Sequence, residues 1–164
     1  MKKLMLTIFL SVLFAGCAST PTEKFEKGNS LRASGEKEKA RKYFEKACEE
    51  NHYEACAEAA SLWRSGDSRN PENIKAYKLY RKACKGDYLP ACVTIAEARL
   101  EGKMGIFKDI SSAGKLFERL CKNEHGNGCR GLAELYAKGL GNYEKDVSRA
   151  KELFDKACNL GSIE

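Results

Sequence analysis

Small and aromatic residues recur along this chain with a period of 36 to 37 residues. Four alanines hold one position of the period, namely Ala40, Ala76, Ala113 and Ala150. Four residues after each alanine comes a large aromatic residue: Phe44, Tyr80, Phe117 and Phe154. A period of this size predicts a solenoid, in which each repeat buries its apolar side against its neighbours.

Within each repeat the pattern predicts two helices. A small residue at Ala60, Ala96 and Ala133 would let the two helices approach closely. Apolar residues follow at Leu62, Ala98 and Leu135, and glycines at Gly66, Gly102 and Gly139. Glycine is the usual residue of a left-handed helix C-cap, so it ends the first helix. The predicted pairs are 22–34 with 36–49, 54–65 with 72–85, 90–101 with 109–122, and 127–138 with 146–159.

The first repeat departs from this pattern. Five residues lead from Gly35 to Ala40, whereas the later repeats have ten or eleven between the same positions, and no cysteine opens its first helix. We therefore predict an N-terminal capping repeat.

The N-terminus has the features of an export signal. Lys2 and Lys3 precede an apolar stretch of 11 residues, 4–14, which is too short to span a bilayer. The stretch 13–17, Leu-Phe-Ala-Gly-Cys, resembles the lipobox of bacterial lipoproteins. A plain secretory signal with a coincidental cysteine is the alternative.

The lipobox resemblance implies cleavage before Cys17, a lipid on its sulfur and acylation of the new amine. Two or three acyl chains anchor a protein stably. Ala18 stands where Asp usually retains lipoproteins in the inner membrane, so the resemblance implies an outer-membrane protein that faces the periplasm. We expect a signal peptide at 1–16, a lipidated tether at 17–22 and the solenoid at 23–164.

The spacing between the other seven cysteines alternates between 8 and roughly 28 residues. Two thiols eight residues apart across a tight turn suit a disulfide, and an exported chain meets oxidising machinery. The predicted pairs are Cys48–Cys56, Cys84–Cys92 and Cys121–Cys129. Metal binding is the alternative, because His52 and His125 each fall between two cysteines; Tyr88 holds that place in the remaining pair. If the cysteines form disulfides, the two histidines would serve the turns.

Cys158 has no partner in the pattern, because its partner would be residue 166 and the sequence given ends at Glu164. We expect an inert, buried thiol in a truncated last repeat. An intermolecular disulfide, and hence a dimer through Cys158, is the alternative.

The chemistry-bearing motifs are few. Without Lys2 and Lys3 the chain carries 27 basic and 23 acidic residues, interspersed, which does not favour nucleic-acid binding. The phosphate, zinc, acyl-transfer and dithiol motifs sought are absent, and no metal or cofactor is expected. The S-x-x-K motif of serine β-lactamases occurs at Ser34, Ser112 and Ser148, where a helix-capping role is the simpler interpretation.

Short motifs around the cysteines resemble Sel-like repeats (SLRs), especially the disulfide-rich branch typified by the Helicobacter cysteine-rich proteins. They are 82–84 (Lys-Ala-Cys), 156–158 (Lys-Ala-Cys), 121–129 (Cys-Lys-Asn-Glu-His-Gly-Asn-Gly-Cys) and 135–139 (Leu-Tyr-Ala-Lys-Gly). The resemblance covers about 23–161 and implies an all-α, right-handed superhelical solenoid of about four helix-turn-helix repeats. It also implies a possible β-lactam-binding or hydrolysing activity.

The first helices of such repeats line a concave surface, where we place partner binding. Seven residues after the second cysteine of each pair stand Trp63, Arg99 and Tyr136, residue types common at interface hot spots. Trp63 and Tyr136 could instead be half-buried packing residues. Arg64, Arg99 and Arg130 would suit an acidic partner, and Glu58, Glu97 and Glu134 a basic one.

These features favour a nonenzymatic outer-membrane lipoprotein that binds a protein partner in the periplasm. Some small SLR lipoproteins act as immunity proteins that block toxic phospholipase effectors, and an envelope adaptor is equally compatible. A β-lactam-binding hydrolase is the enzymatic alternative.

Overall fold

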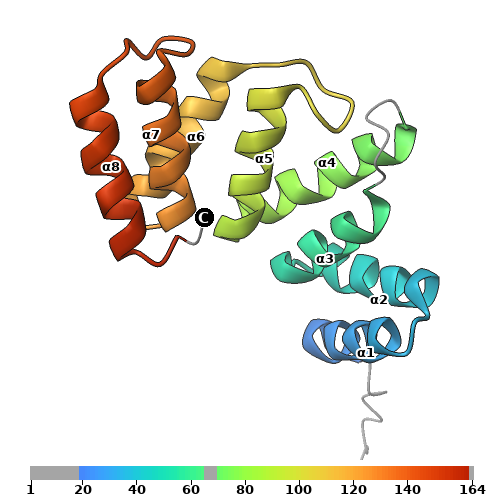
Figure 1. The fold of residues 1–164 in the computed structure, drawn as a ribbon. Helices are drawn as coiled ribbons and strands as arrows, with labels where there is room; N and C mark the ends of the chain where they lie inside the picture. Colours follow the sequence, from blue (N-terminus) through green and yellow to red (C-terminus); the bar gives the residue numbers. More distant parts are fainter. Residues whose placement is uncertain (1–18, 65–69, 163–164) are drawn as a thin grey trace, which may run out of the picture.

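The computed structural model describes residues 19–64 and 70–162, which form eight α-helices and no strand (Figure 1). The helices are α1 (Pro21–Ala33), α2 (Lys37–Glu49), α3 (Tyr53–Trp63), α4 (Pro71–Lys85), α5 (Leu89–Glu101), α6 (Ile110–Lys122), α7 (Gly126–Lys138) and α8 (Val147–Asn159). No bound differs from the predicted one by more than two residues. The predicted pairing of two helices in each repeat is confirmed.

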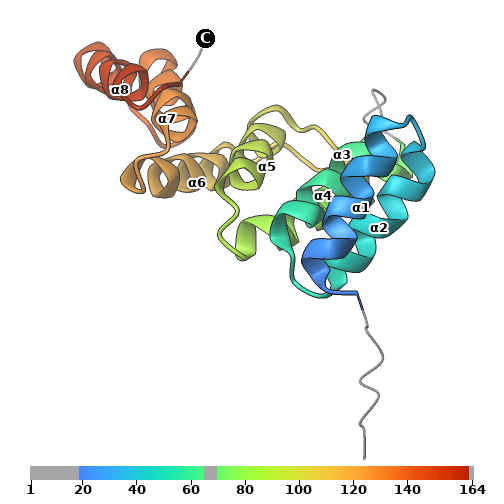
Figure 2. The ribbon, with the colours of Figure 1, turned by 90° about the horizontal axis from the view of Figure 1, so that it is seen from below.

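The helices follow one another in an open, curved row, with α1 and α8 at opposite ends (Figures 1 and 2). Each helix packs mainly against the helices before and after it in the chain. This arrangement is that of a repeat solenoid, which has nearest-neighbour contacts and no central core.

The helix ends follow local sequence signals. Gly102 and Gly139 adopt the predicted left-handed C-cap, with φ of 71° and 65°. Helix α3 ends earlier than predicted, because Arg64 is already extended, and Gly66 lies outside the described residues.

Helix α1 begins at Pro21, so it includes the last two residues of the segment 17–22 that was predicted as a tether. Thr20 forms a capping box with Glu23, and Pro21 occupies the first turn of α1. The capping box satisfies two free backbone N–H groups, so the helix starts as soon as Thr20 is reached. The proposed signal peptide and Cys17 lie outside the described residues.

The repeated aromatic residues form the centres of the core. Phe44 and Phe117 are fully or almost fully buried, and glycines on first helices make room for their rings. A Cβ atom at Gly28 would lie 2.5 Å from the Phe44 ring, and one at Gly131 would lie 2.4 Å from the Phe117 ring. Phe154 holds the same position in the fourth repeat and is 40% exposed, because no later helix of the described chain covers it.

Three disulfides join the end of a second helix to the start of the next first helix, as predicted. The pairs are Cys48–Cys56, Cys84–Cys92 and Cys121–Cys129, and their Cα atoms are 4.6, 4.6 and 4.3 Å apart. All six cysteines are buried. His52 serves the turn, since its Nδ1 accepts a hydrogen bond from the Ala55 N–H (3.2 Å) and caps α3.

Cys158 is free and exposed, so the expectation of a buried thiol is wrong. Cys48, Cys84 and Cys121 hold the same position in the earlier repeats and are buried. The following first helix covers each of those three, whereas none of the described helices follows α8.

A cation reinforces each disulfide junction from the following repeat. Lys82 Nζ donates to the Cys48 carbonyl oxygen (2.6 Å), and Lys156 Nζ donates to the Cys121 carbonyl oxygen (3.3 Å). Both carbonyls lie at the C-terminal end of a second helix, where the helix dipole favours positive charge. In the middle junction the Arg119 guanidinium donates to the Sγ atoms of Cys84 and Cys92 (3.2 and 3.1 Å).

The contrast between two equivalent phenylalanines gives a test of this packing. We expect Phe44→Ala to lower the free energy of unfolding by about 3–5 kcal/mol, because it leaves a cavity in a rigid core. Phe154→Ala should cost less than about 1.5 kcal/mol, since much of that ring already contacts water. Urea denaturation followed by circular dichroism would measure both, and equal losses would contradict the described packing.

Candidate partner-binding surfaces

The structure divides the predicted partner-binding residues between two sides of the first helices. Trp63, Arg99 and Tyr136 stand seven residues after a cysteine, whereas Glu97 and Glu134 stand five after one. With 3.6 residues in a turn, these positions point to nearly opposite sides of the helix. Trp63, Arg99 and Tyr136 therefore do not share a surface with Arg130 and the glutamates, which corrects the single binding surface predicted from sequence.

Trp63 is a packing residue, which was the alternative interpretation. Its ring lies between two cations, with Arg41 Cζ 3.6 Å and Lys75 Nζ 4.3 Å from the ring centroid. Its Nε1 donates a hydrogen bond to the Glu45 carboxylate. The indole is half-buried against the core, and its accessible part lines an open groove beside α4.

Arg99 and Tyr136 repeat this arrangement in the next two repeats. Arg99 Nε donates to the Tyr77 hydroxyl oxygen (3.2 Å). The Tyr136 ring meets the Tyr143 ring edge-on at 5.2 Å, and Arg149 Cζ lies 4.6 Å from the Tyr136 centroid. The residue seven positions after the cysteine of α3, α5 and α7 thus packs beneath side chains of a second helix or a loop.

The sequence interpretation missed the cations that cover these aromatic rings. Lys75 and Arg149 both stand nine residues before the cysteine of their second helix, which is Cys84 for Lys75 and Cys158 for Arg149. The shared register was visible in the sequence. The contact of these cations with the aromatic rings was not visible there, because periodicity does not tell which helix a side chain meets.

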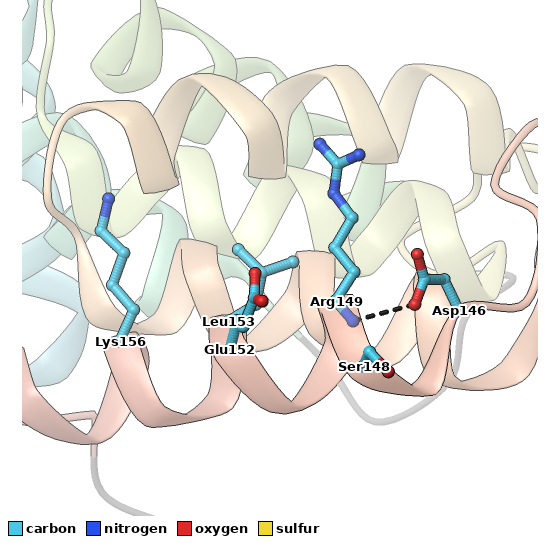
Figure 3. A pocket seen from close by; sticks show the side chains of 6 residues that line it. All are labelled: Asp146, Ser148, Arg149, Glu152, Leu153 and Lys156. Atoms are coloured by element: carbon cyan, nitrogen blue, oxygen red, sulfur yellow. Dashed lines mark hydrogen bonds between the residues drawn. The ribbon is translucent and has the colours of Figure 1, made fainter.

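Open grooves run beside the second helices at two equivalent places. The first has a volume of about 350 Å³, and Lys75, Lys78, Leu79 and Lys82 of α4 line one side of it. The second, of about 520 Å³, is lined along α8 by the residues in the same register: Arg149, Glu152, Leu153 and Lys156 (Figure 3). Arg149 and Lys156 rise from the same side of α8.

The free sides of the first helices carry a different set of side chains, which we call the first-helix face. Its members are Arg32, Glu58, Glu97, Arg130 and Glu134. Arg32 pairs with Glu58 across α1 and α3, and Arg130 Nη1 lies 3.3 Å from the Glu134 carboxylate within α7. Arg64, at the end of α3, is exposed.

The carboxyl of Glu97 shows that charges on neighbouring first helices affect one another. Neighbouring side chains exclude water from this carboxyl and raise its pKa, although the residue as a whole stays exposed. The Arg130 guanidinium, on α7, acts in the opposite direction. Charges on α5 and α7 thus act on one another within the first-helix face.

The three S-x-x-K serines lie in separate repeats. The Ser34 hydroxyl donates to the Leu31 carbonyl oxygen (2.9 Å) at the end of α1. Ser112 lies in the first turn of α6, where its N–H donates to the Asp109 side chain, and Ser148 lies in the first turn of α8 beside the open groove. Among the described residues, no hydrogen bond joins any of these serines to the lysine of its motif.

The described residues contain neither a metal-binding cluster nor a membrane-spanning helix. In 19–64 and 70–162, no group of His, Cys, Asp and Glu side chains is placed to hold a metal ion. The same residues contain no helix with the length and apolar character that a membrane crossing requires.

A family model described as "Sel1 repeat" matches four segments, at residues 26–52, 54–88, 90–125 and 126–162. Each match begins near a first helix and runs through the second helix that follows it. No curated protein matches this chain.

Several solved structures share the fold. A Sel1 repeat protein from Oxalobacter formigenes superposes with a TM-score of 0.72 at 23% identity, over 84% of this chain and 55% of that one. A protective antigen of uropathogenic Escherichia coli with an SLR fold also gives 0.72, at 19% identity, over 87% and 31% of the two chains. This chain therefore spans about half of the first protein and a third of the second.

The cysteine-rich protein B of Helicobacter pylori is similar in length as well. Its TM-score is 0.58 at 27% identity, over 77% of this chain and 90% of that chain.

Proposed function

Because this chain belongs to the Sel1 repeat family, we propose that it is a nonenzymatic lipoprotein of the outer membrane that binds a protein partner in the periplasm. Sel1 repeats generally mediate contacts between proteins. The observation that carries the proposal is the first-helix face, on which acidic and basic side chains of consecutive repeats lie at the surface, exposed or half-buried.

The first-helix face suits a protein better than a small molecule. Small-molecule sites are concave and mostly apolar, and they enclose most of their ligand. The grooves found here are open and lie on the second-helix side, whereas the first-helix face presents charges of both signs. Such charges set the specificity and association rate of protein complexes more than their affinity.

Two roles fit this proposal. As an immunity protein, the chain would cover and neutralise a toxic phospholipase effector delivered to the periplasm. As an envelope adaptor, it would hold a resident protein at the membrane. The identity of the captured protein distinguishes the two, since an immunity protein would capture a phospholipase and an adaptor would capture a resident envelope protein.

A β-lactam-binding hydrolase is the second candidate, as the resemblance of the cysteine motifs to the disulfide-rich SLR branch implies. Purified protein and a chromogenic cephalosporin provide the test. Turnover that persists through repurification, at a rate proportional to protein concentration, would favour the hydrolase over a pure binding function.

The first-helix face gives a direct test of partner binding. The double variant Glu97→Lys with Arg130→Glu reverses both charges and leaves the net charge unchanged. We expect it to lower capture of the partner from envelope extract about tenfold or more, because like charges would oppose each other across the interface. Capture would use tagged, lipidated protein after mild cross-linking, with quantification by mass spectrometry.

The matched control is Glu144→Lys with Lys145→Glu, which makes the same exchange on the exposed loop before α8. The control should capture the partner as the unaltered chain does, and circular dichroism should show that both variants are folded. Equal capture by all three proteins would rule out the first-helix face as the binding surface.

The lipid anchor has its own test. Cys17→Ser removes the sulfur that would carry the lipid, so this variant should incorporate no labelled palmitate and should leave the membrane fraction of cell envelopes. Cys158→Ser is the control, since it removes an exposed thiol elsewhere and should be labelled normally. Palmitate labelling that survives Cys17→Ser would refute the anchor.

A further inference from the structure

The two helices of each repeat differ sharply in charge. The second helices α2, α4, α6 and α8 contain 16 Lys and Arg against 7 Asp and Glu. The first helices α1, α3, α5 and α7 contain 6 against 7. The positive charge of the solenoid therefore lies almost entirely on its second-helix side.

The second-helix cations are arranged in register. Three positions matter, counted from the cysteine of each second helix (Cys48, Cys84, Cys121 or Cys158). They are six residues before it, two residues before it and one residue after it. These positions are four and three residues apart, so they lie on one side of each helix. Nine of the twelve side chains are cations, which we call the second-helix stripe: Lys42, Lys46, Lys78, Lys82, Lys85, Lys115, Arg119, Lys122 and Lys156.

The charges of the stripe are not neutralised within the described chain. Lys82 is half-buried and the other eight residues are exposed. Lys82, Arg119 and Lys156 donate to carbonyl oxygens or disulfide sulfurs, and among the described residues no member forms an ion pair with a carboxylate. By contrast, four of the six first-helix cations pair with glutamates: Lys24, Arg32, Arg130 and Lys138.

We propose that the second-helix stripe binds the anionic phospholipid headgroups of the membrane to which the chain is anchored. This inference rests on the proposed lipid anchor. The cations extend over the second helices of consecutive repeats and do not converge on one pocket, which suits a surface of many dispersed negative charges. Each Lys or Arg near an anionic membrane contributes attraction of about 1 kcal/mol.

The short tether supports a membrane as the partner. Two residues separate Cys17 from Thr20, which caps α1. Even fully extended, three residue steps reach only about 10 Å. The solenoid is then held at the headgroup layer, where an uncompensated positive side meets a high local concentration of anionic lipid without a separate association step.

The stripe also leaves the first-helix face available. Its positions lie on second helices, whereas the proposed protein-binding charges lie on first helices. Binding of the stripe to lipid would turn the second-helix side toward the membrane and leave the first helices free to meet a protein partner.

Vesicle binding of the lipid-free solenoid, residues 19–164, tests this inference. The buried residues of the described chain lie between Gly28 and Ala157, so this protein keeps the whole described core. We expect it to co-sediment with vesicles of phosphatidylethanolamine and phosphatidylglycerol (3:1) at 50 mM NaCl, and to bind phosphatidylcholine vesicles about tenfold or more weakly. At 500 mM NaCl the binding should be lost, because salt screens exposed charges.

The test variant reverses three stripe lysines that form no hydrogen bond or ion pair within the described residues: Lys78→Glu, Lys85→Glu and Lys122→Glu. We expect an affinity for the anionic vesicles at least about 100-fold lower. The matched control reverses three exposed lysines outside the stripe that also form no ion pair within the described residues: Lys27→Glu, Lys108→Glu and Lys145→Glu. It has the same net charge and should lose less than about tenfold.

Equal losses in the two triple variants would overturn the stripe, since net charge alone would then explain binding. Equal binding to both vesicle types, or no binding to either, would overturn the lipid partner. These outcomes are independent of the proposed function, because the vesicle assay uses neither the anchor nor the protein partner. Circular dichroism would confirm that both variants keep the helical fold.

Discussion

The junction between a second helix and the next first helix is the constraint on which the rest of this structure depends. Each junction carries a buried disulfide, and a cation of the following repeat reaches it. A solenoid has no central core to hold distant repeats together, so its shape is the sum of its nearest-neighbour contacts. Fixing the three junctions fixes the relative placement of four helix pairs.

That rigidity keeps the charges of the two layers apart. The first helices carry nearly balanced charge and the second helices carry an excess of cations. A chain free to bend at its junctions would bring these layers into changing contact. A pinned solenoid instead presents two persistent surfaces, which is what simultaneous binding of a protein and a membrane would require.

The sequence predicted the fold well because the information is periodic. The alanines, aromatics and cysteines mark equivalent positions, and equivalent positions share one structure, so helix bounds and disulfide pairs follow. Periodicity does not specify which neighbour a side chain meets. The sequence interpretation therefore placed Trp63 and Arg130 on one surface. Trp63 stands seven residues after its cysteine and Arg130 stands one residue after its cysteine, and these two positions point to different sides of a first helix.

Ends of the pattern were harder to predict for the same reason. Burial at the cysteine position depends on the next repeat, and Cys158 is exposed where Cys121 is buried. The start of α1 was predicted one residue too late, because the capping box at Thr20 is a local signal that the repeat pattern does not contain. The second-helix stripe, by contrast, could have been found by aligning the cations on the cysteines.

Unfolding of the middle junction variant, Cys84→Ser with Cys92→Ser, tests the role of the junctions most directly. Closing a loop of this length contributes about 2–3 kcal/mol, so the free energy of unfolding in urea should fall by that amount. Hydrogen exchange should quicken first in α4 and α5, which flank the lost disulfide. Cys158→Ser should change neither quantity. A variant with the stability and exchange of the oxidised chain would contradict the claim that the disulfides hold the solenoid together.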